Sequence, residues 1–328
     1  MKNATGNKSR ISRAKWKLPS RELVAKTNGP LTDLLKSEEW ASSTAKLPLA
    51  LGQELNGHWV IPDLAQLRHL LIAGISFEKD NCIHSVLAGL LSVRTPDEMR
   101  LILMDGTMNQ LSRYGKLPHL LSPLLKTNKR IDRALLWAVD EFDSRVELLR
   151  QAGVRDIDAY NERIRKSASE KGLKQASRKI PHVVIIISEL WFVELGSAVF
   201  PRFCKVVEER AYKTGIHLIG MTMEPDESLT KSLQSSIRGR VAFNLLNADF
   251  SRLVIGQSGA EKLDLNRDML IRLRAGRVIR AQGARILPAE TAKIVRFWAK
   301  QGKPDYIPEF GPKETRGEIG IPSVKTRR

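Results

Sequence analysis

Cysteine is scarce in this sequence, whose 328 residues contain only Cys82 and Cys204. Two isolated thiols are too few for a disulfide framework or a cysteine-based metal site. Both fall in apolar helical patterns, so we expect buried thiols in a reducing cytoplasm and no bound metal. The six histidines show no motif spacing, which argues against a Ser/His catalytic triad.

Long hydrophobic runs are also missing. The apolar run 183–187 is far shorter than the roughly 20 residues that a bilayer needs. The first 20 residues are basic and polar and lack the apolar segment of a signal peptide. We therefore expect no membrane span and a cytoplasmic location.

Acidic residues are outnumbered, since 54 Lys and Arg stand against 36 Asp and Glu and give a net charge of +18. Such a balance indicates a polyanionic partner, most often nucleic acid, with an anionic membrane surface as the alternative. The charge is concentrated in residues 1–30, 161–180 and 271–285. A single basic run is often only a solvated face of the protein, but three together favour a surface that binds a polyanion.

Between its two ends the chain alternates short apolar runs with helical patterns. The expected strands are 70–74, 101–105, 182–188, 217–222, 240–245, 269–273 and 277–286, and the expected helices are 81–92, 128–151, 199–213, 228–236, 248–256 and 289–301. Strands that are apolar throughout predict an α/β fold with a mostly parallel central sheet and helices on both faces. Ligands of such sheets bind at the carboxyl ends of the strands, which directs attention to the loops after Gly74, Asp105, Ser188 and Thr222.

Composition divides the chain into three parts. Residues 1–30 read as a basic disordered arm and residues 311–328 as a basic flexible tail. The segment 31–310 reads as one folded domain, with 31–62 as a candidate small N-terminal sub-domain.

The expected strand 70–74 runs through a loop into a helix, which is the setting of a phosphate-binding loop. Such a loop uses glycines to aim backbone N–H groups at phosphates, a Lys for charge and a Ser or Thr for Mg²⁺. Here the eight positions read GISFEKDN, with Gly74 first. Lys79, Asp80 and Asn81 occupy the places of the second Gly, the Lys and the hydroxyl residue. The helix is expected to begin near Asn81, with Asp80 placed as its N-cap. A carboxylate of the loop, from Glu78 or Asp80, is expected to take the role of the phosphate, and solvated carboxylates are the alternative.

The expected strand 182–188 ends in Ser188 and Glu189. The comparable strand of nucleotide hydrolases ends in Asp-Glu, where the Asp orders Mg²⁺ and the Glu polarises water. Ser188 lacks that carboxylate. We expect Glu189 to face solvent, with a remnant of a catalytic base as the alternative.

Together these segments resemble the FtsK/SpoIIIE family of DNA translocase motors over roughly residues 30–310. The similar segments are LTDLLKSEEW at 31–40, LALGQELNG at 49–57, HLLIAG at 69–74, LPHLLSP at 117–123, AYKTGIHL at 211–218, GAEKL at 259–263, RDML at 267–270 and QGKPDY at 301–306. The resemblance implies a RecA-like P-loop NTPase fold, double-stranded DNA as partner and a hexameric ring or an assembly with an active motor.

The sequence departs from the family at its catalytic positions. The family loop Gly-Thr-Thr-Gly-Ser-Gly-Lys-Ser becomes GISFEKDN, its Asp-Pro-Lys becomes Asp105-Gly106-Thr107, and its metal-ordering Asp becomes Ser188. Its Thr-Gln-Arg-Pro becomes TMEP, beginning at Thr222. The membrane anchor and winged-helix module of many family members are not expected here.

These departures predict a degenerate motor that binds DNA without hydrolysing ATP, in DNA translocation or chromosome partitioning contexts. No cofactor is expected on this hypothesis. An active ATP-dependent translocase with a non-standard Mg-ATP site, or a regulatory partner of an active motor, is the alternative.

The resemblance also suggests residues for two further roles. Arg240 and Arg252 match family arginines and could act on the nucleotide site across a ring interface, with structural salt bridges between subunits as the alternative role. The candidate DNA contacts are Arg163, Arg165, Lys166, Lys171, Lys174, Arg178, Lys179, Arg272 and Arg274. The stretch 163–179 is expected to be a loop, and Arg272 and Arg274 share one face of an expected strand, where they could instead line an interface.

Overall fold

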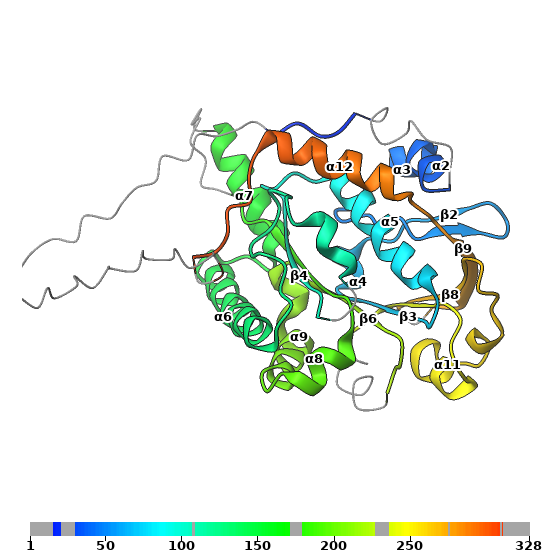
Figure 1. Cartoon of the computed structure of the whole chain (residues 1–328). Helices are drawn as coiled ribbons and strands as arrows, with labels where there is room; N and C mark the ends of the chain where they lie inside the picture. Colours follow the sequence, from blue (N-terminus) through cyan, green and yellow to red (C-terminus); the bar gives the residue numbers. More distant parts are fainter. Residues whose placement is uncertain are drawn as a thin grey trace, which may run out of the picture.

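A nine-stranded sheet forms the centre of the computed structural model, which describes residues 16–20, 30–106, 109–170, 179–226, 236–274, 276–308 and 310 (Figure 1). The strands are β1 (Gly52–Glu54), β2 (Trp59–Val60), β3 (Leu70–Ala73), β4 (Met99–Met104), β5 (His182–Ile187), β6 (Ile216–Thr222), β7 (Gly239–Ala242), β8 (Asp268–Leu273) and β9 (Val278–Gly283). Their order across the sheet is β2-β1-β9-β8-β7-β3-β6-β5-β4.

The helices connect and cover these strands. They are α2 (Pro30–Lys36), α3 (Glu38–Ser42), α4 (Leu64–Leu67), α5 (Phe77–Val93), α6 (Asn128–Gln151), α7 (Ile157–Glu170), α8 (Leu190–Gly196), α9 (Phe200–Thr214), α11 (Ala248–Ile255) and α12 (Pro288–Gln301), with short 3₁₀ turns η1 (Gln110–Tyr114) and η2 (Ala260–Lys262). Among the described residues, no helix combines the length and hydropathy that a membrane crossing requires.

Five strands, β7, β3, β6, β5 and β4, run parallel to one another. Every residue of β3, β4, β5 and β6 is buried. Continuous apolar strands are required where helices cover both faces of a sheet. The predicted α/β fold of the RecA-like P-loop type is confirmed.

The other four strands extend this sheet as an antiparallel unit. β8 pairs with β7 and β9, and β9 pairs with β1, which forms a short hairpin with β2. The sequence did not predict β1 and β2, because a three-residue and a two-residue strand carry no detectable periodicity. Residues 31–62 thus contribute both strands to the same sheet, and their apolar side chains share its core.

Alternate residues of each parallel strand face two separate hydrophobic clusters. Leu70 and Ile72 point to the cluster that includes α2, α3, α5 and α12. Leu71 and Ala73 point to the cluster that includes α6, α8, α9 and α11. This two-residue alternation places α5 and α12 over one face and α6 and α9 over the other (Figure 1).

Part of the expected disordered arm packs on the domain. Trp16 lies against Trp298 of α12, with ring centroids 6.2 Å apart. The backbone N–H of Lys17 donates to Gln301 Oε1 at 2.7 Å, and Gln301 Nε2 donates to the Lys17 carbonyl at 2.9 Å. Residues 16–20 therefore differ from the expected disordered arm. The contact of the Trp16 and Trp298 rings and the two hydrogen bonds between Lys17 and Gln301 hold this segment on the domain. The rest of the arm, the tail and most of the expected helix 228–236 lie outside the described residues.

Candidate nucleotide-binding site

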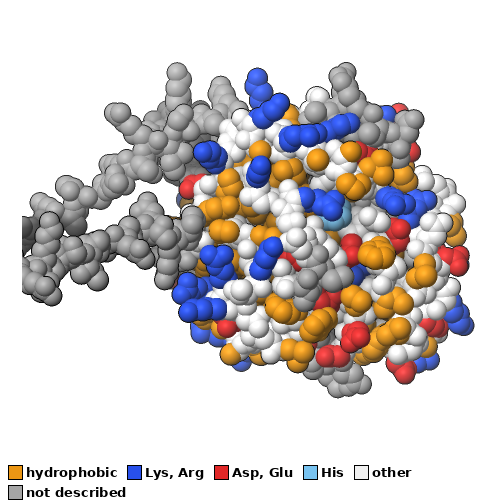
Figure 2. Space-filling model, viewed as in Figure 1, with side chains coloured by type: hydrophobic (Ala, Val, Ile, Leu, Met, Phe, Trp, Pro, Cys, Tyr) orange, Lys and Arg blue, Asp and Glu red, His pale blue; other side chains and the backbone are white. Residues whose placement is uncertain are grey.

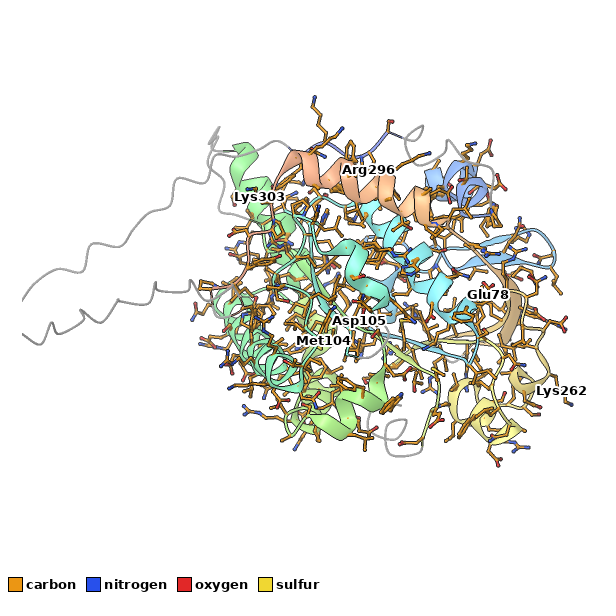
Figure 3. All side chains as sticks on the ribbon, viewed as in Figure 1. Glu78, Met104, Asp105, Lys262, Arg296 and Lys303 are labelled. Carbon is orange, nitrogen blue, oxygen red and sulfur yellow. The ribbon has the colours of Figure 1, made fainter. Side chains whose placement is uncertain are left out.

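The carboxyl ends of the parallel strands meet at one edge, as the order of elements predicts. The backbone N–H of Gly74 after β3 donates to the Thr222 carbonyl of β6 at 3.1 Å. Ser188 after β5 is joined to β4, because its N–H donates to the Met104 carbonyl at 2.9 Å. Figure 3 labels Met104 and Asp105 at the end of β4, and Glu78 at the start of α5.

The loop after β3 is shorter than expected because α5 begins at Phe77 rather than near Asn81. No glycine follows Gly74 in this stretch, and Glu78, Lys79 and Asp80 accept helical geometry. Negative charge in a first helical turn also favours the helix. Phe77 is left 79% exposed.

The expectation that Asp80 caps the helix is wrong. Ser76 occupies the N-cap position, with no side-chain cap bond, and Asp80 lies inside the first turn. Its Oδ1 atom is buried without a hydrogen-bond partner. Asn81 Nδ2 donates locally to Glu78 Oε2 at 3.1 Å. The extra helical turn is what moves Asp80 away from the helix end.

A buried ion pair joins Lys79 of α5 to Glu189 after β5. The Lys79 ammonium lies 3.2 Å from Glu189 Oε2, and the side chains are 4% and 3% exposed. Glu189 Oε1 accepts the backbone N–H of Met223 at 3.2 Å. The expectation that Glu189 faces solvent is therefore wrong, because the extended helix brings a lysine to it.

Burial shifts the pKa of both carboxyl groups next to this lysine. It raises the pKa of Glu189, and the nearby Lys79 ammonium opposes the rise. The pKa of Asp80 is raised for the same reason, with Lys79 at 3.9 Å again opposing the shift. The Lys79 ammonium thus interacts with two carboxyl groups, those of Asp80 and Glu189, that burial makes harder to ionise.

Ser188 is engaged with the neighbouring strand. Its hydroxyl donates to Asp105 Oδ1 at 3.0 Å, and Asp105 Oδ2 accepts the backbone N–H of Leu111 at 2.8 Å. Thr222 Oγ1 closes a small turn by accepting the N–H of Glu224 at 3.2 Å. The side chains of Asp105, Ser188 and Thr222 are therefore satisfied within the protein.

The two candidate interface arginines make local contacts. Arg240 Nη1 donates to the Val254 carbonyl at 3.3 Å, at the end of α11, and burial lowers its pKa, with Arg272 adding to the effect. Arg252 pairs with Asp249 one helical turn before it at 2.5 Å.

The candidate DNA contacts are divided among several elements. Arg163, Arg165 and Lys166 lie on α7, so the expectation of a loop there is wrong. Lys171, Lys174 and Arg178 lie outside the described residues, and Lys179 is exposed after that gap. Arg272 donates to the Ile255 carbonyl at 3.0 Å, whereas Arg274 lies beyond the end of β8 and donates to Gln66 Oε1 at 3.0 Å.

The Lys79–Glu189 contact was missed by the sequence analysis. The two residues are 110 positions apart, and each was treated as an isolated remnant. The signal that could have found the contact is the unbroken run of helix formers after Ser76, which turns Lys79 inward from the first helical turn.

Comparisons with known proteins agree with the fold and the resemblance. A family model described as FtsK/SpoIIIE family matches residues 30–256. A protein named DNA translocase FtsK from Haemophilus influenzae is 33% identical over 90% of this chain and 60% of its own length. One named DNA translocase SpoIIIE from Bacillus subtilis is 32% identical over 87% of this chain and 36% of its own.

Solved structures share the architecture at lower identity. The cytoplasmic domain of the Thermomonospora curvata Type VII secretion ATPase EccC superimposes with a TM-score of 0.67. It is 15% identical, and the match covers 88% of this chain and 35% of that one. The chain spans 36% to 60% of the length of the two curated relatives. With the family model matching more than half of its residues, the chain belongs to the FtsK/SpoIIIE family.

Proposed function

We propose that this chain is a DNA-binding, non-hydrolysing member of its family that forms rings or joins rings of an active motor. Its context is DNA translocation or chromosome partitioning, and its partner is double-stranded DNA. The Lys79–Glu189 ion pair is the observation that supports this proposal, because it engages the lysine of the segment that resembles the family's phosphate loop.

A triphosphate has little to gain at this site. Phosphate loops offer several backbone N–H groups and a free ammonium, whereas here the loop is helical from Phe77 and the ammonium is already paired. Asp80 and Glu189 would repel a phosphate. Each unit-charge interaction at about 4 Å is worth roughly 4 kcal/mol at an effective dielectric near 20, so the residues present do not fit Mg-ATP.

Charge supports the DNA partner. The net charge of +18 favours a polyanion, and the curated relatives are named DNA translocases. We include in the proposal the basic stretch 163–179, of which Lys171, Lys174 and Arg178 are the residues to test. Arg240 and Arg252 are proposed to stabilise subunit contacts.

Nucleotide binding by the purified chain is the decisive measurement. A fluorescent ATP analogue with Mg²⁺ should show no saturable binding below millimolar concentration. Micromolar binding, or phosphate release stimulated by DNA, would overturn the proposal in favour of an active translocase with a non-standard site.

Two variants refine this test. Lys79→Gly with Asp80→Lys restores the glycine and the lysine of the family loop, and should make the melting temperature respond to added ATP. Lys79→Ala with Asp80→Ala opens the same positions without adding a cation and serves as the control. Charge reversal at Lys171, Lys174 and Arg178 should weaken DNA binding about equally across sequences.

A further inference from the structure

The solvent face of α12 carries a row of cations that none of the candidate sites above includes. Lys293, Arg296 and Lys300 are spaced three and four residues apart, and Lys303 follows just beyond the helix end. This face lies opposite Ile294 and Trp298, which pack into the core. We call Lys293, Arg296, Lys300 and Lys303 the α12 stripe. Figure 3 labels Arg296 and Lys303 along the upper edge of the molecule, where Figure 2 shows Lys and Arg side chains at the surface.

The α12 stripe has no acidic partners within the described part of the chain: none of its four cations makes an ion pair there. The acidic residue of α12, Glu290, is buried and accepts hydrogen bonds from Thr32 Oγ1 at 3.2 Å and the Leu287 N–H at 2.6 Å. The helix therefore presents cations to solvent and keeps its carboxylate inside.

Two exposed arginines on other helices are neutralised locally. Arg150 pairs with Glu147 at 2.7 Å and Arg165 pairs with Glu162 at 2.6 Å, each one turn along its helix. An i,i+3 pair of this kind reduces the attraction of the arginine for another anion. The α12 stripe differs from these surfaces because its charge is unopposed.

From this contrast we propose that the α12 stripe binds the phosphate backbone of duplex DNA. Three cations on a rigid helix span about 10 Å at the 1.5 Å rise of each residue, a length that covers several backbone charges of a duplex. Contacts of this kind recognise phosphate and not base sequence. The inference rests on the proposed function and names a surface that would serve it.

Two other polyanions fit this face less well. A helix that lies on an anionic membrane also inserts apolar side chains, whereas Ile294, Val295 and Trp298 of α12 are buried in the domain core. Single-stranded DNA is held on exposed aromatic rings, and the exposed aromatic residues of the described chain, Phe77 and Trp191, lie outside α12. A duplex needs neither feature.

The experiment compares two triple variants of the full chain. Lys293→Gln, Arg296→Gln and Lys300→Gln remove three cations of the stripe. Arg150→Gln, Arg155→Gln and Arg210→Gln remove three that are already paired with Glu147, Asp156 and Asp143. Binding to a fluorescent duplex is measured across salt concentrations, and melting temperatures show that both variants are folded.

The expected result is specific to the stripe. Its variant should bind at least about tenfold more weakly at 0.1 M salt and lose about 2.7 from the slope of log affinity against log salt, while the control keeps the parent slope. Equal slopes in both variants would overturn the inference and leave the proposed function intact. A parent that binds no DNA would overturn both. Loss of binding to phosphatidylserine vesicles with unchanged DNA binding would assign the stripe to membranes and overturn the inference.

Discussion

The rings of His182 and His217 lie nearly parallel, with an angle of 24° between their planes and centroids 5.3 Å apart, and His182 Nδ1 lies 3.0 Å from His217 Nε2. His217 Nδ1 donates to the Arg68 carbonyl at 2.8 Å, because a carbonyl oxygen only accepts. Burial, with His182 adding to it, holds the pKa of His217 well below its usual value, so His217 is neutral and its Nε2 accepts. His182 Nδ1 is therefore the donor between the two rings.

The other nitrogen of His182 faces Asp158 of α7, with Nε2 3.3 Å from Oδ1. Lys46 contacts the second oxygen of Asp158 at 2.6 Å. Burial alone would raise the pKa of Asp158, but hydrogen bonds from His182 and Lys46 outweigh it and hold the pKa below its ordinary value. The His182 ring thus contacts both His217 and Asp158, and it ties α7 to β5.

Asp158→Asn should loosen α7 by removing the charge that holds His182 and Lys46. The backbone amides of α7 should exchange hydrogen about tenfold faster, which corresponds to about 1.4 kcal/mol of local stability. Hydrogen–deuterium exchange measures this directly. Glu162→Gln on the same helix is the control, since Glu162 contacts only Arg165 and Lys166 among its described ion pairs. Equal exchange in both variants would contradict the role of Asp158.

Breaking the Lys79–Glu189 pair from either side should destabilise the fold. Lys79→Met or Glu189→Gln leaves one buried group without its partner, a change that costs about 3–5 kcal/mol. Urea unfolding of both single variants and the double variant forms a complete cycle. The double variant should lose less than the sum of the singles, and strict additivity would show that the two groups do not interact.

Lowering the pH from 6.5 should destabilise the domain because buried histidines resist protonation. Burial lowers the pKa of His69 and of His119 from 6.5 to about 3, and that of His84 to about 4. Each unfolded histidine binds a proton that its folded form does not, so each removes up to about 1.4 kcal/mol per pH unit. This stability is present above pH 6.5 and is lost as the pH falls toward 4.

Asp80 and Glu189 act in the opposite sense at lower pH. Their folded pKa values are raised, so they favour folding as the pH falls through those values. His69→Asn isolates one histidine, because the Asn carbonyl can accept the Leu218 N–H that His69 Nδ1 now accepts at 2.9 Å. Melting temperatures between pH 7.5 and 5 should fall less steeply in this variant. The exposed His58→Asn is the control and should keep the parent slope.

Gln301→Ala should release the segment around Trp16 by deleting both bonds to the Lys17 backbone. Limited proteolysis after Lys17 should become several times faster than in the parent. Lys17→Gln is unsuitable because it removes the cleavage site, so Lys17→Arg is the control: it keeps a tryptic site and leaves the backbone bonds unchanged. Unchanged proteolysis of Gln301→Ala would show that the indole contact alone holds the segment.

Periodicity predicted the parallel half of the sheet well, because its strands are apolar at every position and its long helices have clear apolar faces. β3, β5 and β6 lie within one residue of the expected ends, and α6 spans the expected residues. It did not predict α7, whose residues 157–170 look like a charged loop when only hydrophobic content is considered. α7 is attached to the domain mainly through the buried Ile157, through Asp158 at His182 and through Asn161 at Ile180. Contacts between residues so far apart in the sequence cannot be predicted from hydrophobic periodicity.

The sequence predicted where the candidate site lies but not which side chains interact in it. Gly74, Asp105, Ser188 and Thr222 converge because parallel strands end together, which depends only on topology. The partner of Lys79 depended on where α5 begins. A shift of four residues in a helix start turns side chains to new directions, and sequence patterns define helix ends less well than helix centres.

The hydrogen bonds between Lys17 and Gln301 join residues that are 284 positions apart in the chain. Beside them, Trp16 packs on Trp298 of α12, the helix that also carries Lys293, Arg296 and Lys300. The entropy of closing a loop grows with its length, so a contact between positions this far apart depends on the strands and helices between them being in place. Loss of this contact therefore reports unfolding of the domain as a whole, although the contact itself involves only two residues at the surface.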